Sequence, residues 1–170
     1  MITEVMRVRS DPFTHQVLIN KGKNNGVYIG QPVTSTLGVV GQISQVGNTT
    51  SRVLLIVDAS HGLPVRDRRN GLIANVHGSG EWNRLDIPFI QSTADLKVGD
   101  ILETSGLGGV FPAGYPVARV SHFSYVKGAL FADASATPIA KIDKSRYLLL
   151  LWPDKNNVEK KVSLSDAKLP

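Results

Sequence analysis

The chain has 170 residues, of which 42% are hydrophobic, enough for one domain or two small ones with an ordinary soluble core. It contains no cysteine, which excludes disulfides, thiolate metal sites and cysteine nucleophiles. Its formal net charge of +5 comes from scattered basic residues, apart from a cluster at 66–69 that Asp67 dilutes, so we expect no nucleic acid partner.

Strand patterns recur along the chain, and no window of 11 or more residues combines helical apolar spacing with freedom from Gly and Pro. Alternation is clearest at 84–89, where Leu85, Ile87 and Phe89 fall on one face. In chain order the predicted strands are 4–9, 16–20, 38–46, 52–57, 72–77, 84–89, 100–104, 116–123, 131–137 and 147–152. The sequence therefore predicts an all-β fold.

The two halves of the chain contain similar sequence segments in the same order. The segment 29–33 resembles 98–102, and 40–43 resembles 117–120. The offsets are 99 − 30 = 69 and 118 − 41 = 77 positions, so the second half has gained eight residues within a Gly-rich loop. We expect two similar lobes on either side of the break Gly78-Ser79-Gly80.

Closure into barrels is expected because short strands otherwise leave exposed edges. The prediction is two small six-stranded β-barrel lobes side by side, the first at 1–80 and the second at 81–153. The segment 154–170 is polar and charged with few apolar residues, so we expect a flexible, disordered tail.

The Gly-rich loop, within 103–120, is the candidate binding site. Its glycines allow backbone angles that other residues avoid and can hold neighbouring apolar side chains in a fixed display. The alternative is that the loop aromatics fold back onto the core. The predicted partner-binding residues are Phe111, Pro112 and Tyr115, with Gly106, Gly108 and Gly109 shaping the loop.

The same region carries a family resemblance. The sequences LKVGD at 96–100 and TSGLGGVFPAGYPV at 104–117 resemble the signature of the MreC family of rod-shape-determining proteins. NGV at 25–27, GVVGQ at 38–42 and LLIVD at 54–58 extend the resemblance across most of 4–152.

The resemblance implies a non-enzymatic scaffold of the bacterial cell-elongation machinery, on the periplasmic side of the inner membrane. It implies binding to the elongation penicillin-binding transpeptidase and other membrane elongation proteins, guidance of peptidoglycan synthesis, and self-association as a closed dimer or an open filament. Family members have a membrane helix and a coiled coil before this region. We therefore expect this chain to be the outer domain, with its anchor absent and Met1 an added start.

Catalysis is the main alternative class, because a two-barrel fold with a Ser-Gly-x-Gly-Gly segment resembles chymotrypsin-like serine hydrolases. Ser105 would be the nucleophile and His61 the base, with Asp58 or Asp86 as the orienting acid. Asp58, however, is close to His61 in sequence, where it more simply caps a turn.

Metal, cofactor and carbohydrate sites are weakly indicated. The histidines His15, His61, His77 and His122 lack paired spacing, so we expect neither a metal nor a cofactor. Trp82 and Trp152 leave a peptidoglycan-binding module open, since indoles stack on sugars, although they can equally be buried.

Overall fold

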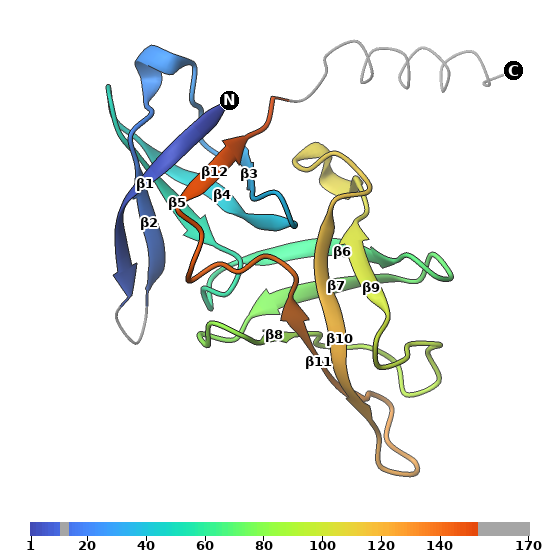
Figure 1. The fold of residues 1–170 in the computed structure, drawn as a ribbon. Coiled ribbons are helices and arrows are strands. Elements are labelled where there is room, and N and C mark those ends of the chain that lie inside the picture. Colours follow the sequence, from blue (N-terminus) through green and yellow to red (C-terminus); the bar gives the residue numbers. More distant parts are fainter. Residues whose placement is uncertain (11–13, 153–170) are drawn as a thin grey trace, which may run out of the picture.

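The computed structural model describes residues 1–10 and 14–152, and this part of the chain consists of strands with two short 3-10 turns (Figure 1). The strands are β1 (Ile2–Ser10), β2 (His15–Ile19), β3 (Pro32–Thr34), β4 (Val39–Val46), β5 (Ser51–Leu55), β6 (Gly62–Asp67), β7 (Ile73–Gly78), β8 (Leu85–Asp86), β9 (Ile101–Thr104), β10 (Pro116–Ser124), β11 (Asp133–Pro138) and β12 (Tyr147–Leu150). The 3-10 turns are η1 (Lys23–Asn25) and η2 (Leu107–Gly109).

The strands form two closed barrels of six strands each. The first barrel runs β1-β12-β3-β4-β5-β2 and the second runs β10-β11-β8-β7-β6-β9, with antiparallel neighbours throughout. Closure leaves neither sheet with a free edge, which is how short strands avoid exposing unpaired backbone groups. The predicted all-β fold of two small six-stranded barrels is confirmed.

The division between the barrels differs from the predicted break at residue 80. Strands β6 and β7 lie before that break, yet they pair with β9 and β8 of the second barrel. Strand β12 lies in the predicted second lobe, yet it pairs with β1 and β3 of the first barrel. The first barrel is thus completed by the C-terminal strand, and the chain crosses between barrels after β5 and again before β12. The predicted tail at 154–170 lies outside the described residues.

The predicted internal echo has a structural counterpart in the hairpins β3–β4 and β9–β10. The N–H of Gly30 donates to the carbonyl of Ile43 at 2.8 Å, and the N–H of Gly99 donates to the carbonyl of Val120 at 2.8 Å. Both glycines have positive φ, 86° and 95°, which a side chain would strain. The two hairpins are therefore equivalent, and the second carries the longer connection.

Alternating residues of the strands fill the barrel interiors. In β2, for example, Val17 and Ile19 are buried while Gln16 and Leu18 are half-buried. Among the described residues, no helix has the length and apolar character needed to cross a membrane.

Candidate functional site

The Gly-rich loop joins β9 to β10 and has the irregular backbone that its sequence predicts. Gly106, Gly108 and Gly109 have φ of 80°, 78° and 69°; η2 begins directly after Gly106 and contains the other two. A Cβ on Gly108 or Gly109 would meet nothing within 4 Å, so conformation alone favours glycine there.

Thr104, a fully buried residue at the end of β9, fixes the base of this loop. Its Oγ1 donates a 2.6 Å hydrogen bond to the carbonyl of Pro112 and accepts the N–H of Tyr115 at 2.9 Å. One hydroxyl thus ties both ends of the segment 112–115 to the barrel. The loop is held in one conformation, as a binding surface requires.

The loop does not display its aromatic residues as predicted. Phe111 is only 5% exposed and belongs to the hydrophobic core, so its predicted role as a displayed contact is wrong. Pro112 and Tyr115 are half-buried, and Tyr115 packs against the same core. The aromatic side chains anchor the loop instead, because burying a phenyl ring lowers the free energy relative to leaving it exposed to water. The exposed apolar side chains are those of Leu107 and Val110.

A larger group of exposed apolar side chains lies at the other end of β10. It is carried by the β10–β11 hairpin, which projects away from the first barrel (Figure 1), and by the segment after β8 that pairs with this hairpin. We call it the apolar platform; it consists of Phe89, Tyr125, Val126, Leu130 and Phe131. Phe89 is 80% exposed, and its ring packs edge-on against that of Phe131 with centroids 5.8 Å apart. A cluster of large apolar side chains on one tip marks an interaction surface more strongly than scattered ones do.

Backbone hydrogen bonds hold the two halves of the platform together. The N–H of Ser92 donates to the carbonyl of Leu130 at 3.0 Å, and the N–H of Ala132 donates to the carbonyl of Ile90 at 2.9 Å. The Ser92 hydroxyl adds a 2.8 Å bond to the carbonyl of Ala129. The platform is therefore preformed, which lowers the entropic cost of binding a partner.

Phe89 is the one described residue other than glycine with positive φ, at 59°. Leu85 and Ile87 are buried as the alternating pattern predicts, but the left-handed turn at Phe89 sends its ring outward. A strained backbone conformation of this kind costs about 1 to 3 kcal/mol, and residues that adopt it are found most often at functional sites. The apolar run YVKGALF at 125–131, around a turn glycine, is the sequence signal that could have revealed the platform.

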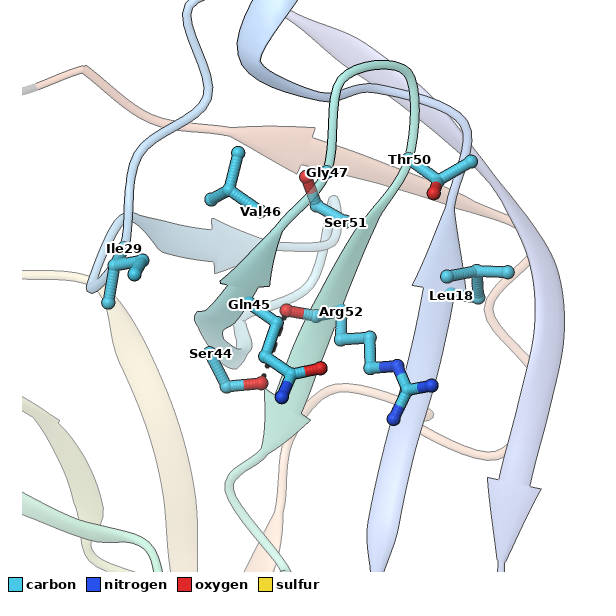
Figure 2. A pocket seen from close by; sticks show the side chains of 9 residues that line it. All are labelled: Leu18, Ile29, Ser44, Gln45, Val46, Gly47, Thr50, Ser51 and Arg52. Carbon is cyan, nitrogen blue, oxygen red and sulfur yellow. Dashed lines mark hydrogen bonds between the residues drawn. The ribbon is translucent and has the colours of Figure 1, made fainter.

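A recess of about 640 Å³ lies on the first barrel, between β2, β4 and β5 (Figure 2). Figure 2 shows Gln45 and Arg52 extending in one direction from neighbouring strands, and the hydroxyl of Ser44 donates to the carbonyl of Arg52 at 3.4 Å. The lining side chains are aliphatic, hydroxyl, amide and guanidinium groups. They include no general base, so the recess has no hydrolytic machinery.

The predicted components of a serine hydrolase are not brought together. His61 shares a 2.8 Å hydrogen bond between its Nε2 and Oε1 of Gln42, and burial lowers its pKa to about 4. The Ser105 hydroxyl accepts the N–H of Leu107. Asp58 accepts the N–H and hydroxyl of Ser60 at 2.9 and 2.6 Å, which confirms the turn-capping interpretation. The alternative acid, Asp86, pairs with Arg84 at 3.3 Å.

The remaining candidates are also accounted for by local contacts. Trp82 is half-buried and meets the His15 ring edge-on at 4.9 Å, whereas Trp152 is exposed beside Gly26. Within residues 1–10 and 14–152, no three His, Asp or Glu side chains gather as a metal site. His122 instead lies 3.6 Å from Asp133 at the exposed end of β10.

Two closed barrels with a preformed apolar tip define a rigid binding module. The model of the family described as "Rod shape-determining protein MreC, barrel core" matches residues 5–152. The chain belongs to this family of cell shape-determining proteins. The MreC of Haemophilus influenzae is 43% identical over 168 residues, covering 99% of this chain and 48% of that protein. The chain thus spans about half the length of this relative.

Solved structures agree with this assignment. The crystal structure of MreC from Pseudomonas aeruginosa has a TM-score of 0.86 and 45% identity, covering 89% of this chain and 98% of that one. Two more distant structures share the fold. One, at TM-score 0.74 and 19% identity over 88% of this chain and 93% of that one, is described as the major periplasmic domain from the cell shape-determining filament MreC. The other is MreC of Helicobacter pylori in complex with penicillin-binding protein PBP2, at TM-score 0.62 and 22% identity over 87% and 94%.

Proposed function

We propose that this chain is a periplasmic scaffold domain of the cell-elongation machinery, which binds a penicillin-binding transpeptidase and thereby guides peptidoglycan synthesis. Family membership across residues 5–152 carries the proposal. It is supported by the Helicobacter pylori MreC structure, which is a complex with PBP2. In this role the chain makes and breaks no bond; it favours one conformation of its partner by binding that conformation more tightly.

The apolar platform is the surface that we propose for the transpeptidase. Its five large apolar side chains are all exposed, and backbone bonds preorganise it. Binding hot spots are typically apolar or aromatic anchors of this kind. The Gly-rich loop stays a second predicted contact, now through Leu107 and Val110 rather than through the buried Phe111.

Self-association is proposed alongside partner binding, because a related protein of the same fold is described as a filament. A head-to-tail contact between different faces would give an open filament, and a self-complementary face a closed dimer. Sedimentation over a range of concentrations distinguishes the two, since a dimer stops growing at twice the monomer mass.

The function is tested in cells that lack their own family member and have lost rod shape. The full-length protein containing this domain should restore rods, and the same protein with Phe89→Ser and Leu130→Ser should fail at equal abundance. The matched control is Leu37→Ser with Ile73→Ser, two side chains about half exposed elsewhere. Restoration by all three proteins would contradict the platform assignment, and restoration by none would contradict the proposed function.

A further inference from the structure

A pair of carboxyl groups lies at one end of the second barrel. Asp67 is the last residue of β6 and pairs with Leu102 of β9, and Asp100 directly precedes β9, so the two side chains are neighbours. Asp67 is only 1% exposed, and Asp100 is half-buried. The Oδ1 of Asp67 accepts the N–H of Arg69 at 2.8 Å, while its buried Oδ2 has no hydrogen-bond partner among the described residues. A buried carboxylate oxygen without a donor, next to a second carboxyl group, is stable only if one of the two groups carries a proton and donates it to the other.

The surrounding bonds place that proton on Asp67. The Nε and Nη2 of Arg69 donate to both carboxylate oxygens of Asp100 at 3.1 and 3.0 Å, and the N–H of Lys97 adds a 3.0 Å bond. The same guanidinium binds Asp95 at 3.1 Å. Asp100 and Asp95 are therefore the ionised members, because charged donors face them. Asp67 accepts one backbone N–H, and no cationic side chain of the described residues forms an ion pair with it.

The other charges near the pair are engaged elsewhere. Arg66 of β6 and Arg68, which directly follows that strand, both bind Glu103 of β9, at 2.9 and 3.0 Å. On β10, Arg119 donates to the carbonyl of Gly99 at 3.4 Å. None of these groups compensates a second negative charge at Asp67, so the proton is needed for the pair to stay closed.

The first barrel fills the equivalent position without a titratable group. Gln31 corresponds to Asp100 by the 69-residue offset, and its Oε1 accepts the N–H of Tyr28 as Asp100 accepts that of Lys97. Its Nε2 donates to the carbonyl of Leu151 at 3.0 Å. An amide brings its own donor at any pH, whereas the pair in the second barrel depends on an exchangeable proton.

The pair loses its proton at a pH within the physiological range. Burial and the hydrogen bond to Asp100 raise the pKa of Asp67 to about 6. Burial alone would raise the pKa of Asp100, but the bonds from Arg69 and Asp67 lower it to about 2. Because the folded pKa of Asp67 exceeds its ordinary value of 3.8, the stability it contributes is complete below that value and is lost as pH rises through about 6.

We propose that Asp67 and Asp100 form a proton-dependent latch, which holds the β6–β7 turn at 68–72 against the loop 95–100 and releases it when the shared proton leaves. Asn70 adds to the closed state, since its Nδ2 donates to the carbonyl of Asp95 at 2.7 Å. The loop 95–100 follows closely after Ser92, which anchors the apolar platform. Release therefore loosens a segment that adjoins the platform.

The latch is tested by nuclear magnetic resonance of the chain between about pH 4 and pH 8. Site-resolved signals are needed because His61, whose pKa is lowered, changes global stability in the opposite direction over the same range. The Asp67 carboxyl carbon and the amide signals of Arg69 and Lys97 should share one transition near pH 6. Amide exchange of Arg69, corrected for intrinsic rates, should accelerate ~10-fold or more above it. An Asp67 carboxyl that titrates near pH 4 would overturn the latch.

A variant gives an independent check. Asp67→Asn supplies a permanent N–H donor to Asp100, so the shared transition should vanish and Arg69 should stay protected at neutral pH. The matched control, Asp86→Asn on half-buried β8, should leave the transition in place. Persistence of the transition in Asp67→Asn would contradict the proposal. Should that variant not fold, the wild-type carboxyl titration decides alone.

Discussion

The backbone N–H of His15 donates a 2.7 Å hydrogen bond to Oδ2 of Asp58, which joins the start of β2 to the segment that leaves the first barrel. The carbonyl of Asp58 lies so close to Gly78 that a Cβ there would overlap it. The His15 ring in turn packs against Trp82 of the second barrel. One buried aspartate therefore organises the junction between the barrels.

Replacing Asp58 should destabilise the whole chain. Asp58→Ala leaves the N–H of His15 and both donors of Ser60 without their acceptor, and hydrogen bonds to a buried charge are worth about 1.5 to 3 kcal/mol. We expect a loss of about 3 kcal/mol in urea unfolding, and a smaller loss for Asp58→Asn, which keeps one acceptor oxygen. Equal stability of Asp58→Ala and wild type would show that the junction does not depend on this carboxylate.

Acid should weaken the fold through His61. Burial lowers its pKa to about 4 from an ordinary 6.5, so the unfolded chain binds a proton before the folded chain does. The resulting loss, about 3 kcal/mol, develops as pH falls from 6.5 to 4. The stability difference between wild type and His61→Gln should shrink over that range. A constant difference for His61→Gln would contradict the buried neutral imidazole.

The two equivalent hairpins require different residues at one corresponding position. A Cβ on Gly41 would overlap the carbonyl oxygen of Leu54 on β5, whereas its counterpart in the second barrel, Ala118, is fully buried with a methyl group. Gly41→Ala should therefore cost about 2 kcal/mol, since forced overpacking typically costs 1 to 3. Ala118→Gly should cost about 1 kcal/mol through backbone entropy. Thermal unfolding measures both, and a neutral Gly41→Ala would show that β4 and β5 can move apart.

Phe111 should behave as a core residue. Phe111→Ala should lose about 3 to 5 kcal/mol, as buried phenylalanines do, and Leu107→Ala in the same loop should stay within about 0.5 kcal/mol. Urea unfolding of both variants decides between an anchoring and a displayed ring. A small effect of Phe111→Ala, similar to that of Leu107→Ala, would restore the original expectation.

The strands were predictable where side chains alternate over five or more residues, because a barrel wall is wet on one side and apolar on the other. Two were not predicted. Strand β3 has only three residues and opens with Pro32, and β6 contains Gly62 and Pro64, which interrupt the strand pattern. Both strands form nonetheless, because hydrogen bonds to the neighbouring strands of the barrel compensate for their weak intrinsic preference for strand structure.

Barrel membership could not be read from sequence order. A break such as Gly78-Ser79-Gly80 marks a turn, and nothing local reveals that β12 returns to the first barrel. The loop aromatics pose a similar problem, since a loop phenylalanine can be an anchor or a contact. Phe111 turned inward, whereas Phe89, which the alternating pattern placed inside, turned outward through its positive φ. A backbone angle at one residue decided which ring is exposed.

The most direct measurement is the affinity of this chain for the periplasmic part of the penicillin-binding transpeptidase from the same organism. We expect Phe89→Ser with Leu130→Ser to weaken binding ~10-fold or more, as loss of an apolar hot spot does, while the control Leu37→Ser with Ile73→Ser should change it less than about twofold. Unchanged affinity in the platform variant would contradict the assignment.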